Sequence, residues 1–256
     1  MTFDISVTLS TLIDGSSFPA EAANQICAAP SVTPTRLPAD GKDTVEVEGF
    51  FWGLWGAIID AAEKNPEAQG QLVKLVVELS NKGSAQPTWR IWGQEQAWKD
   101  LPLIGATARE HFNGFDASDP EETERWVQRN AFLARLTEAK GLFMLYAIWS
   151  LRDALEEEAS TSAAINSGNV RAAAQWIKYA GQKIYKSTEE FPSGPQIGAP
   201  ARGGPKWKGK HGFDAERWAL WKREFTKFST EKSIDELARK DALEAAEKMS
   251  QIEGKA

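Results

Sequence analysis

The chain has 256 residues, of which 42% are hydrophobic and 26% charged, a composition typical of a soluble globular protein with a sizeable core. Its formal net charge of −6 argues against a general nucleic-acid binder, because phosphate neutralisation requires clustered Lys and Arg. The single cysteine excludes an internal disulfide, and with only two histidines the chain lacks a zinc site of the usual Cys/His kind. We therefore expect neither a metal nor another cofactor.

The sequence also indicates a cellular location. Its first residues lack the basic and apolar segments of a secretion signal, and no run of about 18 apolar residues could span a bilayer. We expect a cytoplasmic protein without membrane association, with the nucleus as the alternative location.

Aromatic composition is unusual, with eleven tryptophans against three tyrosines. Such large apolar side chains require either thick helix packing or an aromatic-lined cavity. The count alone fits both.

The first half of the chain is predicted to be helical. Residues 1–42 contain a helix opened by Pro19 and then a proline-rich loop. A long helix over residues 43–63 is apolar on nearly every side, so we expect it at the centre of the first half. Residues 84–103 show no strand pair and are predicted to be irregular. That stretch contains Trp89, Trp92 and Trp98. These indoles either cap the helices or form an aromatic wall.

A pair of helices separated by Gly141 is the most informative stretch. Asp119 and Pro120 predict the start of the first helix, because aspartate caps helix N-termini and proline fixes the first helical φ. Gly141 ends that helix, and the second begins at once. Asn130 and Arg135 lie between residues that the apolar pattern predicts to be buried.

Charge also follows the apolar stripe of the second helix, through Arg152, Asp153 and Glu156. A buried charge must be paired, since its burial otherwise costs several kcal/mol. In one interpretation these groups form a structural network in which Arg135 or Arg152 pairs with an acidic side chain. In the other they line a cavity and contact a ligand.

The second half continues with a helix over residues 168–186 and then an irregular stretch over residues 187–212. Because structureless loops of that length are uncommon, the stretch is either disordered or a functional lid. Its lysines around Trp207 could bind an anionic partner or belong to a mobile surface loop. Two helices follow, and residues 231–256 form a charged C-terminal helix.

Together these elements predict an all-α fold. We expect a single compact array of about eight to ten antiparallel helices, with a long irregular loop before the last two. The predicted main helical domain covers residues 43–230.

Three known catalytic motifs are missing or incomplete. The segment from Gly204 to Lys210 has phosphate-loop spacing, but His211 stands where Ser or Thr should hold magnesium, and no strand precedes it. No aspartate-rich segment of a terpene-forming enzyme is present. A Gly-x-Ser-x-Gly nucleophile elbow is also missing. These absences disfavour nucleotide hydrolysis, metal-dependent prenyl transfer and serine catalysis.

Several motifs occur in a fixed order: Trp98-Lys-Asp-Leu101-Pro102-Leu103, Asn130-Ala-Phe-Leu-Ala-Arg135-Leu136, Ala147-Ile-Trp149-Ser-Leu-Arg152-Asp-Ala-Leu155-Glu156, Ala174-Gln-Trp176, Gly204-Pro-Lys-Trp207-Lys-Gly209 and Arg217-Trp218. In this order they resemble a family of ascomycete fungal proteins that is known as a domain of unknown function. The resemblance covers roughly residues 40–230, with His111-Phe112 as a departure where a bulkier aromatic is expected. It implies a fungal source, an intracellular helical protein and a small-molecule role in specialised metabolism. It assigns no catalytic residues.

Two functions of different classes remain. In the first, the protein binds or transforms a small apolar, anionic metabolite without a metal, in a pocket or buried network made of Trp98, Arg109, Glu110, Trp126, Asn130, Arg135, Trp149, Arg152, Glu156, Trp176 and Trp207. The arginines would hold carboxylate or enolate oxygens, and Glu110 or Glu156 would move protons. In the second, the same charges are paired internally and the protein is a non-catalytic interaction or structural module.

Overall fold

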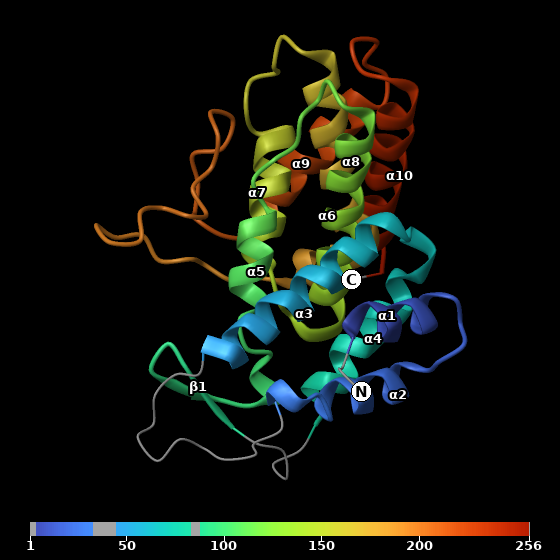
Figure 1. Cartoon of the computed structure of the whole chain (residues 1–256). Coiled ribbons are helices and arrows are strands. Elements are labelled where there is room, and N and C mark those ends of the chain that lie inside the picture. The colour runs from blue at the N-terminus through green and yellow to red at the C-terminus, as the bar shows by residue number, and fades with distance from the viewer. Residues whose placement is uncertain (1–3, 33–44, 83–87, 256) are drawn as a thin grey trace. The chain divides into compact units, whose positions relative to one another are not determined.

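The computed structural model describes residues 4–32, 45–82 and 88–255. Within these ranges the chain forms ten α-helices, three short 3-10 helices and one two-stranded sheet (Figure 1). The predicted all-α fold is therefore confirmed. None of the helices in the described ranges combines the length and the hydropathy that a membrane span requires.

The chain divides into two compact units, which we call unit 1, residues 1–114, and unit 2, residues 115–256. The boundaries proposed from the sequence, at residues 42 and 230, stay predictions, and the first of them lies outside the described residues.

Unit 1 is built around its longest helix, α3. This helix packs against α1, α4 and α5, and α2 packs against α1 and α4. The apolar surface of α3 is buried on several sides, as its sequence predicts, with Phe51, Trp55 and Ile58 almost fully inaccessible. The helices of unit 1 are α1 (Ile5–Ile13), α2 (Pro19–Cys27), α3 (Val45–Lys64), α4 (Gln69–Ser80) and α5 (Ile104–His111).

A short hairpin corrects the prediction that residues 84–103 hold no strand pair. Strand β1 (Trp89–Ile91) pairs with β2 (Gln94–Gln96) in antiparallel register. Both turn residues, Trp92 and Gly93, have positive φ angles of 50° and 75°, as two-residue hairpin turns of the tight primed type require. The sequence hides this turn, because a tryptophan occupies the position where Asn or Asp is the usual signal.

Two tryptophans from this region belong to the core of unit 1. The rings of Trp89 and Trp98 both contact Phe51 edge to face, at centroid distances of 5.1 and 5.2 Å. Trp92, in contrast, is 60% exposed beside Trp52. Most of this indole surface is thus used for helix packing.

Unit 2 is centred on α8, which packs against each of the other four helices of the unit. At its start, α6 is capped by the Asp119 side chain with Pro120 in the first turn, and it ends at Gly141, all as predicted. The helices are α6 (Pro120–Lys140), α7 (Met144–Leu155), α8 (Ala163–Lys186), α9 (Ala215–Phe228) and α10 (Glu236–Glu253).

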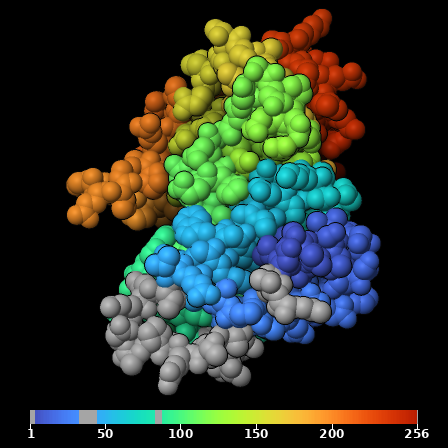
Figure 2. Space-filling view, viewed as in Figure 1, coloured from blue at the N-terminus to red at the C-terminus, as the bar shows by residue number. Residues whose placement is uncertain are grey.

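The predicted long irregular loop before the last two helices is present at residues 187–214, and we call it the α8–α9 loop. Backbone hydrogen bonds join its two ends, from Phe191 to His211 and from Phe213 to Glu189. Between these ends the loop projects from the helices of unit 2, as the orange segment in Figures 1 and 2 shows. Its ends are thus held by regular backbone pairing.

Replacing Gly141 by alanine is expected to lower the free energy of unfolding by about 1 kcal/mol. Gly141 has a φ of 74°, and an added Cβ would have nothing within 4 Å, so backbone strain is the only cost. Gly70 in α4 has equally open surroundings but no positive φ. Gly70→Ala should therefore leave the stability unchanged or raise it. Chemical denaturation measures both effects, and a loss of the same size in both variants would contradict the assignment.

Candidate functional site

The predicted site residues are divided between the units, with Trp98, Arg109 and Glu110 in unit 1 and the other eight in unit 2. Trp98 is fully buried, whereas Arg109 and Glu110 lie exposed on α5. The Arg109 guanidinium donates to the Phe112 carbonyl and to the Asn113 side chain at the end of that helix. In unit 1 the predicted indole is therefore a core residue, and the charged pair is a surface feature.

Asn130 is the centre of a buried hydrogen-bond network in unit 2. Its Oδ1 accepts from the Ser150 hydroxyl at 2.5 Å and from the Trp176 indole at 2.8 Å, while its Nδ2 donates to the Trp126 carbonyl. The side chain is completely buried, and its partners come from α6, α7 and α8. Because a satisfied buried amide specifies one packing arrangement, Asn130 fixes the register of these three helices.

Glu156 forms the second buried network, and its partner is Arg217 of α9. The two side chains are 0% exposed and make a bidentate pair at 2.6 and 3.0 Å. The carboxylate also accepts from the Trp221 indole at 2.7 Å and from the Gly204 backbone at 3.0 Å. The Nη1 of Arg217 also donates to the carbonyls of Ala201 and Gly212. With every position occupied, the Glu156 carboxylate is placed for structure rather than for proton transfer.

Arg152, one of the two arginines considered as a partner for the acidic side chains, does not pair with Glu156. Its Nε contacts the neighbouring Asp153 at 2.8 Å, and the two side chains are 21% and 51% exposed. Arg152 thus forms a partly exposed pair with its sequence neighbour rather than a buried pair with Glu156. Of the pairings considered from the sequence, Arg152 with Asp153 is present, whereas the buried Glu156 pairs with Arg217, which the sequence analysis did not consider.

Two other predicted tryptophans hold the α8–α9 loop. The Trp149 indole donates to the Pro200 carbonyl at 2.8 Å, and the Trp207 indole donates to the Lys210 carbonyl at 2.9 Å. At Gly204 an added Cβ would lie 2.7 Å from the Glu156 carbonyl oxygen. Close packing against the end of α7 therefore explains why residue 204, in the segment with phosphate-loop spacing, is a glycine.

Arg135 is placed differently from the other predicted arginines. Its guanidinium lies 3.8 Å from the centre of the Tyr179 ring, which brings α6 and α8 together by a cation–π contact. Its Nε is buried and has no hydrogen-bond acceptor among the described residues. A buried donor without an acceptor is uncommon in folded proteins, and where one occurs a bound ligand, ion or water often supplies the acceptor.

A solvent-open cavity of about 540 Å³ lies one helical turn beyond Arg135 and Tyr179. Its lining comes from the end of α6, the start of α7, the last turn of α8 and the loop that follows. The lining residues are Glu138, Met144, Gln182, Lys183, Lys186, Ser187 and Glu189. We call this cavity the α8-end pocket.

A second hollow, of about 260 Å³, lies between α8 and α10 and is lined by side chains of both charges, including Lys178, Asp241 and Lys248. Burial raises the pKa of Asp241, whose carboxylate lies 3.4 Å from Arg171. Arg171 also contacts Glu124 at 2.7 Å. The Asp241 carboxylate of this hollow is therefore already paired within the protein.

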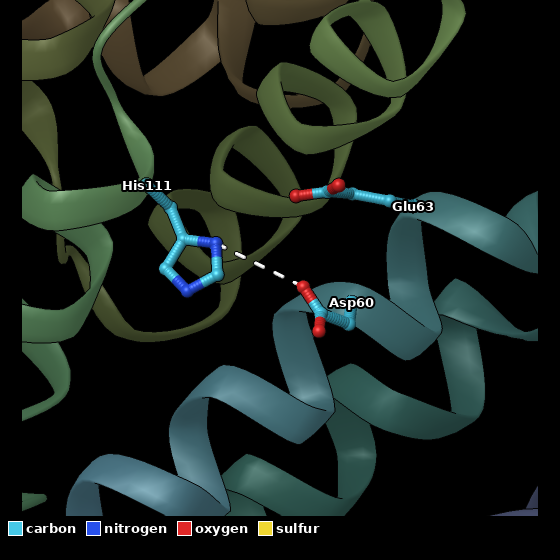
Figure 3. Close-up of side chains that lie close together, drawn as sticks. All are labelled: Asp60, Glu63 and His111. Carbon is cyan, nitrogen blue, oxygen red and sulfur yellow. Dashed lines mark ion pairs between the residues drawn. The ribbon is translucent and has the colours of Figure 1, made fainter. Parts of the chain in front are cut away.

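A cluster that the sequence did not predict lies in unit 1. One ligand-type atom from each of Asp60, Glu63 and His111 lies within 4.8 Å of the others (Figure 3). Asp60 and Glu63 come from α3, and His111 is the last residue of α5. The signal available in the sequence was the spacing of the two carboxylates, which places them on one helix face. Nothing in the sequence located the histidine.

Sequence comparison places the chain in a family. Residues 55–225 match the family described as "Protein of unknown function (DUF3632)". The chain belongs to the DUF3632 family. This finding agrees with the resemblance to a domain of unknown function, and the matched range of the DUF3632 protein includes both the α8-end pocket and the Asp60–Glu63–His111 cluster. No curated protein and no solved structure matches the chain.

Glu156→Gln is expected to destabilise the DUF3632 protein by about 3 to 5 kcal/mol, because it leaves the buried Arg217 charge uncompensated. Arg152→Met should cost less than about 1 kcal/mol, since it removes only a partly exposed pair. Urea denaturation of the two variants measures the difference. Equal losses of unfolding free energy in the two variants would show that the buried pair contributes no more to stability than the partly exposed pair.

Cys27 is expected to react slowly with iodoacetamide. Partial burial raises the pKa of its thiol to about 11. At pH 8 only about 0.1% would then be thiolate, against roughly a quarter of a free cysteine with a pKa near 8.5. The alkylation rate should rise about tenfold per pH unit up to pH 10 and match that of a free thiol once the protein is denatured. A fast reaction at pH 8 in the folded protein would contradict this environment.

Proposed function

We propose that this DUF3632 protein binds a small molecule that carries an anionic group and an apolar part, and that the binding site is the α8-end pocket. The observation that carries the proposal is the buried Arg135 nitrogen without an acceptor among the described residues, one helical turn from a cavity whose lining includes two lysines. A cavity of this size is within the range of small-molecule sites, which hold roughly 300 to 1,000 Å³.

The charges around the pocket support an anion. Lys183 and Lys186 have no carboxylate within ion-pair distance among the described residues, whereas the cations of Arg171 and Arg217 are paired. On α8, residues three and four apart are neighbours, so Lys183 lies beside Tyr179, on which Arg135 stacks. An anion at this point would meet up to three cations, and Arg135 could donate two parallel hydrogen bonds to a carboxylate or phosphate.

Electrostatics also limit the ligand. The exposed carboxylates of Glu138 and Glu189 lie at the rim of the pocket, and the C-terminal end of α8 carries a partial negative charge. A highly charged ligand would therefore meet repulsion at the rim. These features favour a ligand with one anionic group that reaches inward toward Arg135.

The apolar part of the ligand has two surfaces to contact. Met144 lines the pocket, and its flexible thioether can adapt to different shapes. The Tyr179 ring lies on the same side of α8 as Lys183. The proposed ligand is thus of the class expected from the sequence. Of the three arginines that the sequence predicted for the site, only Arg135 is proposed to bind it.

The proposal is tested by measuring the melting temperature with octanoate, acetate and octan-1-ol. Octanoate combines the two required features, whereas acetate has only the charge and octan-1-ol only the apolar chain. At ten times Kd, octanoate should stabilise the protein by about 1.4 kcal/mol, a rise of about 3 to 6 °C. Acetate and octan-1-ol should have much smaller effects.

Variants locate the effect. Arg135→Met and Lys183→Met should each abolish most of the rise that octanoate causes. Lys248→Met, which removes a cation from the hollow between α8 and α10, should leave the rise unchanged. If octanoate has no more effect than octan-1-ol, or if all three variants respond equally, the protein has no such site. An interaction module would then be the better account.

A further inference from the structure

We infer that Asp60, Glu63 and His111 form a binding site for one divalent transition-metal ion. Figure 3 shows the two carboxylates extending from α3 toward the imidazole at the end of α5. The His111 Nδ1 lies 3.9 Å from the Asp60 carboxylate, and the three ligand-type atoms are all within 4.8 Å of one another. The site lies wholly within unit 1, so it does not depend on the proposed ligand of unit 2.

The sequence of α3 builds one side of this site. Gly56, Asp60 and Glu63 are spaced four and three residues apart, so they lie along one face of the helix. A Cβ added at Gly56 would be 3.9 Å from the His111 Nε2, which places the imidazole directly over this face. The ring packs where the helix has no side chain, and its Nδ1 is directed at Asp60.

The donor set determines the kind of ion. One imidazole nitrogen and two carboxylate oxygens suit Zn²⁺ or Mn²⁺, whereas Ca²⁺ and Mg²⁺ prefer oxygen alone and Cu(I) prefers sulfur. Around a tetrahedral ion with bonds of 2.0 to 2.1 Å, ligand atoms are about 3.4 Å apart. The three side chains would therefore need to move together by about an ångström, which small rotations of the side chains provide.

Helix ends add to the attraction for a cation. Glu63 is the next-to-last residue of α3 and His111 is the last residue of α5. The carbonyl end of a helix carries a partial negative charge, and cations near it are stabilised. The C-terminal ends of both α3 and α5 lie at the cluster, so their partial negative charges add to those of the two carboxylates.

The three side chains differ in how much of their surface is exposed to solvent. Glu63 is 7% exposed, while the side chains of His111 and Asp60 are 26% and 56% exposed. The inner carboxylate is thus held in place, and the outer one is free to adjust. Three protein ligands leave a fourth position on the solvent side for water or another small ligand, the arrangement found in catalytic rather than structural zinc sites.

The chain allows a direct test in its unmodified form, because it has only two histidines, His111 and His211. Their imidazole signals can be followed by ¹H–¹⁵N NMR during a titration with ZnCl₂, and the variant His211→Gln assigns them. One equivalent of Zn²⁺ should shift the His111 ring signals and leave those of His211 unchanged. Shifts of neither residue, or of His211 alone, would overturn the site.

Isothermal titration calorimetry with ZnCl₂ and with MnCl₂ gives the stoichiometry and the contribution of each ligand. Glu63→Gln and His111→Gln approximately keep the side-chain size and should each weaken metal binding at least tenfold, because even the loss of a group that only supports a metal ligand typically costs about 10- to 100-fold. The double variant Glu244→Gln, Glu247→Gln removes two carboxylates with the same spacing from α10 and should bind metal like the parent. Circular dichroism confirms that each variant is folded. Equal affinity in all variants, or no saturable binding at a ratio of one, would contradict the proposal.

Discussion

The buried pair of Glu156 and Arg217 is the interaction on which unit 2 depends. It joins α7 to α9 across 61 residues of sequence, and its hydrogen bonds to Gly204, Ala201 and Gly212 also hold the α8–α9 loop. Two charges removed from water are stable only when their partners are complete, and here each position of the carboxylate and most of the guanidinium are used. The pair therefore specifies one arrangement of helix and loop rather than adding general stability.

The polar groups that already have hydrogen-bond partners also limit where a binding site can be. The buried polar side chains of Asn130, Ser150 and Trp176 in unit 2 are hydrogen-bonded to one another, so they are unavailable to a ligand. Arg135 is different because its buried nitrogen has no acceptor among the described residues. In unit 1 the corresponding feature is a concentration of carboxylate and imidazole at two helix ends, which attracts a cation rather than an anion. The two sites that we propose thus have opposite charge preferences.

Local chemistry predicted much of the fold. Asp119, Pro120 and Gly141 acted as the helix start and stop that their side chains and backbone preferences require, and the apolar circumference of α3 identified a buried helix. Pairing between distant residues was not predictable, because helical spacing locates neighbours only within one helix. Arg217 and His111 were therefore missed as partners, whereas the pair of Arg152 with its sequence neighbour Asp153 was among those considered. The hairpin at Trp92 was hidden by a turn residue of unusual type.

The central claim is that Glu156 and Arg217 act together as one buried unit. A double-mutant cycle with Glu156→Gln, Arg217→Met and the combined variant measures this coupling by urea denaturation. The account predicts a coupling energy of at least about 2 kcal/mol, with the combined variant no less stable than Glu156→Gln alone, because removing both charges relieves the penalty of leaving one unpaired. A coupling energy near zero, with losses that simply add, would contradict it.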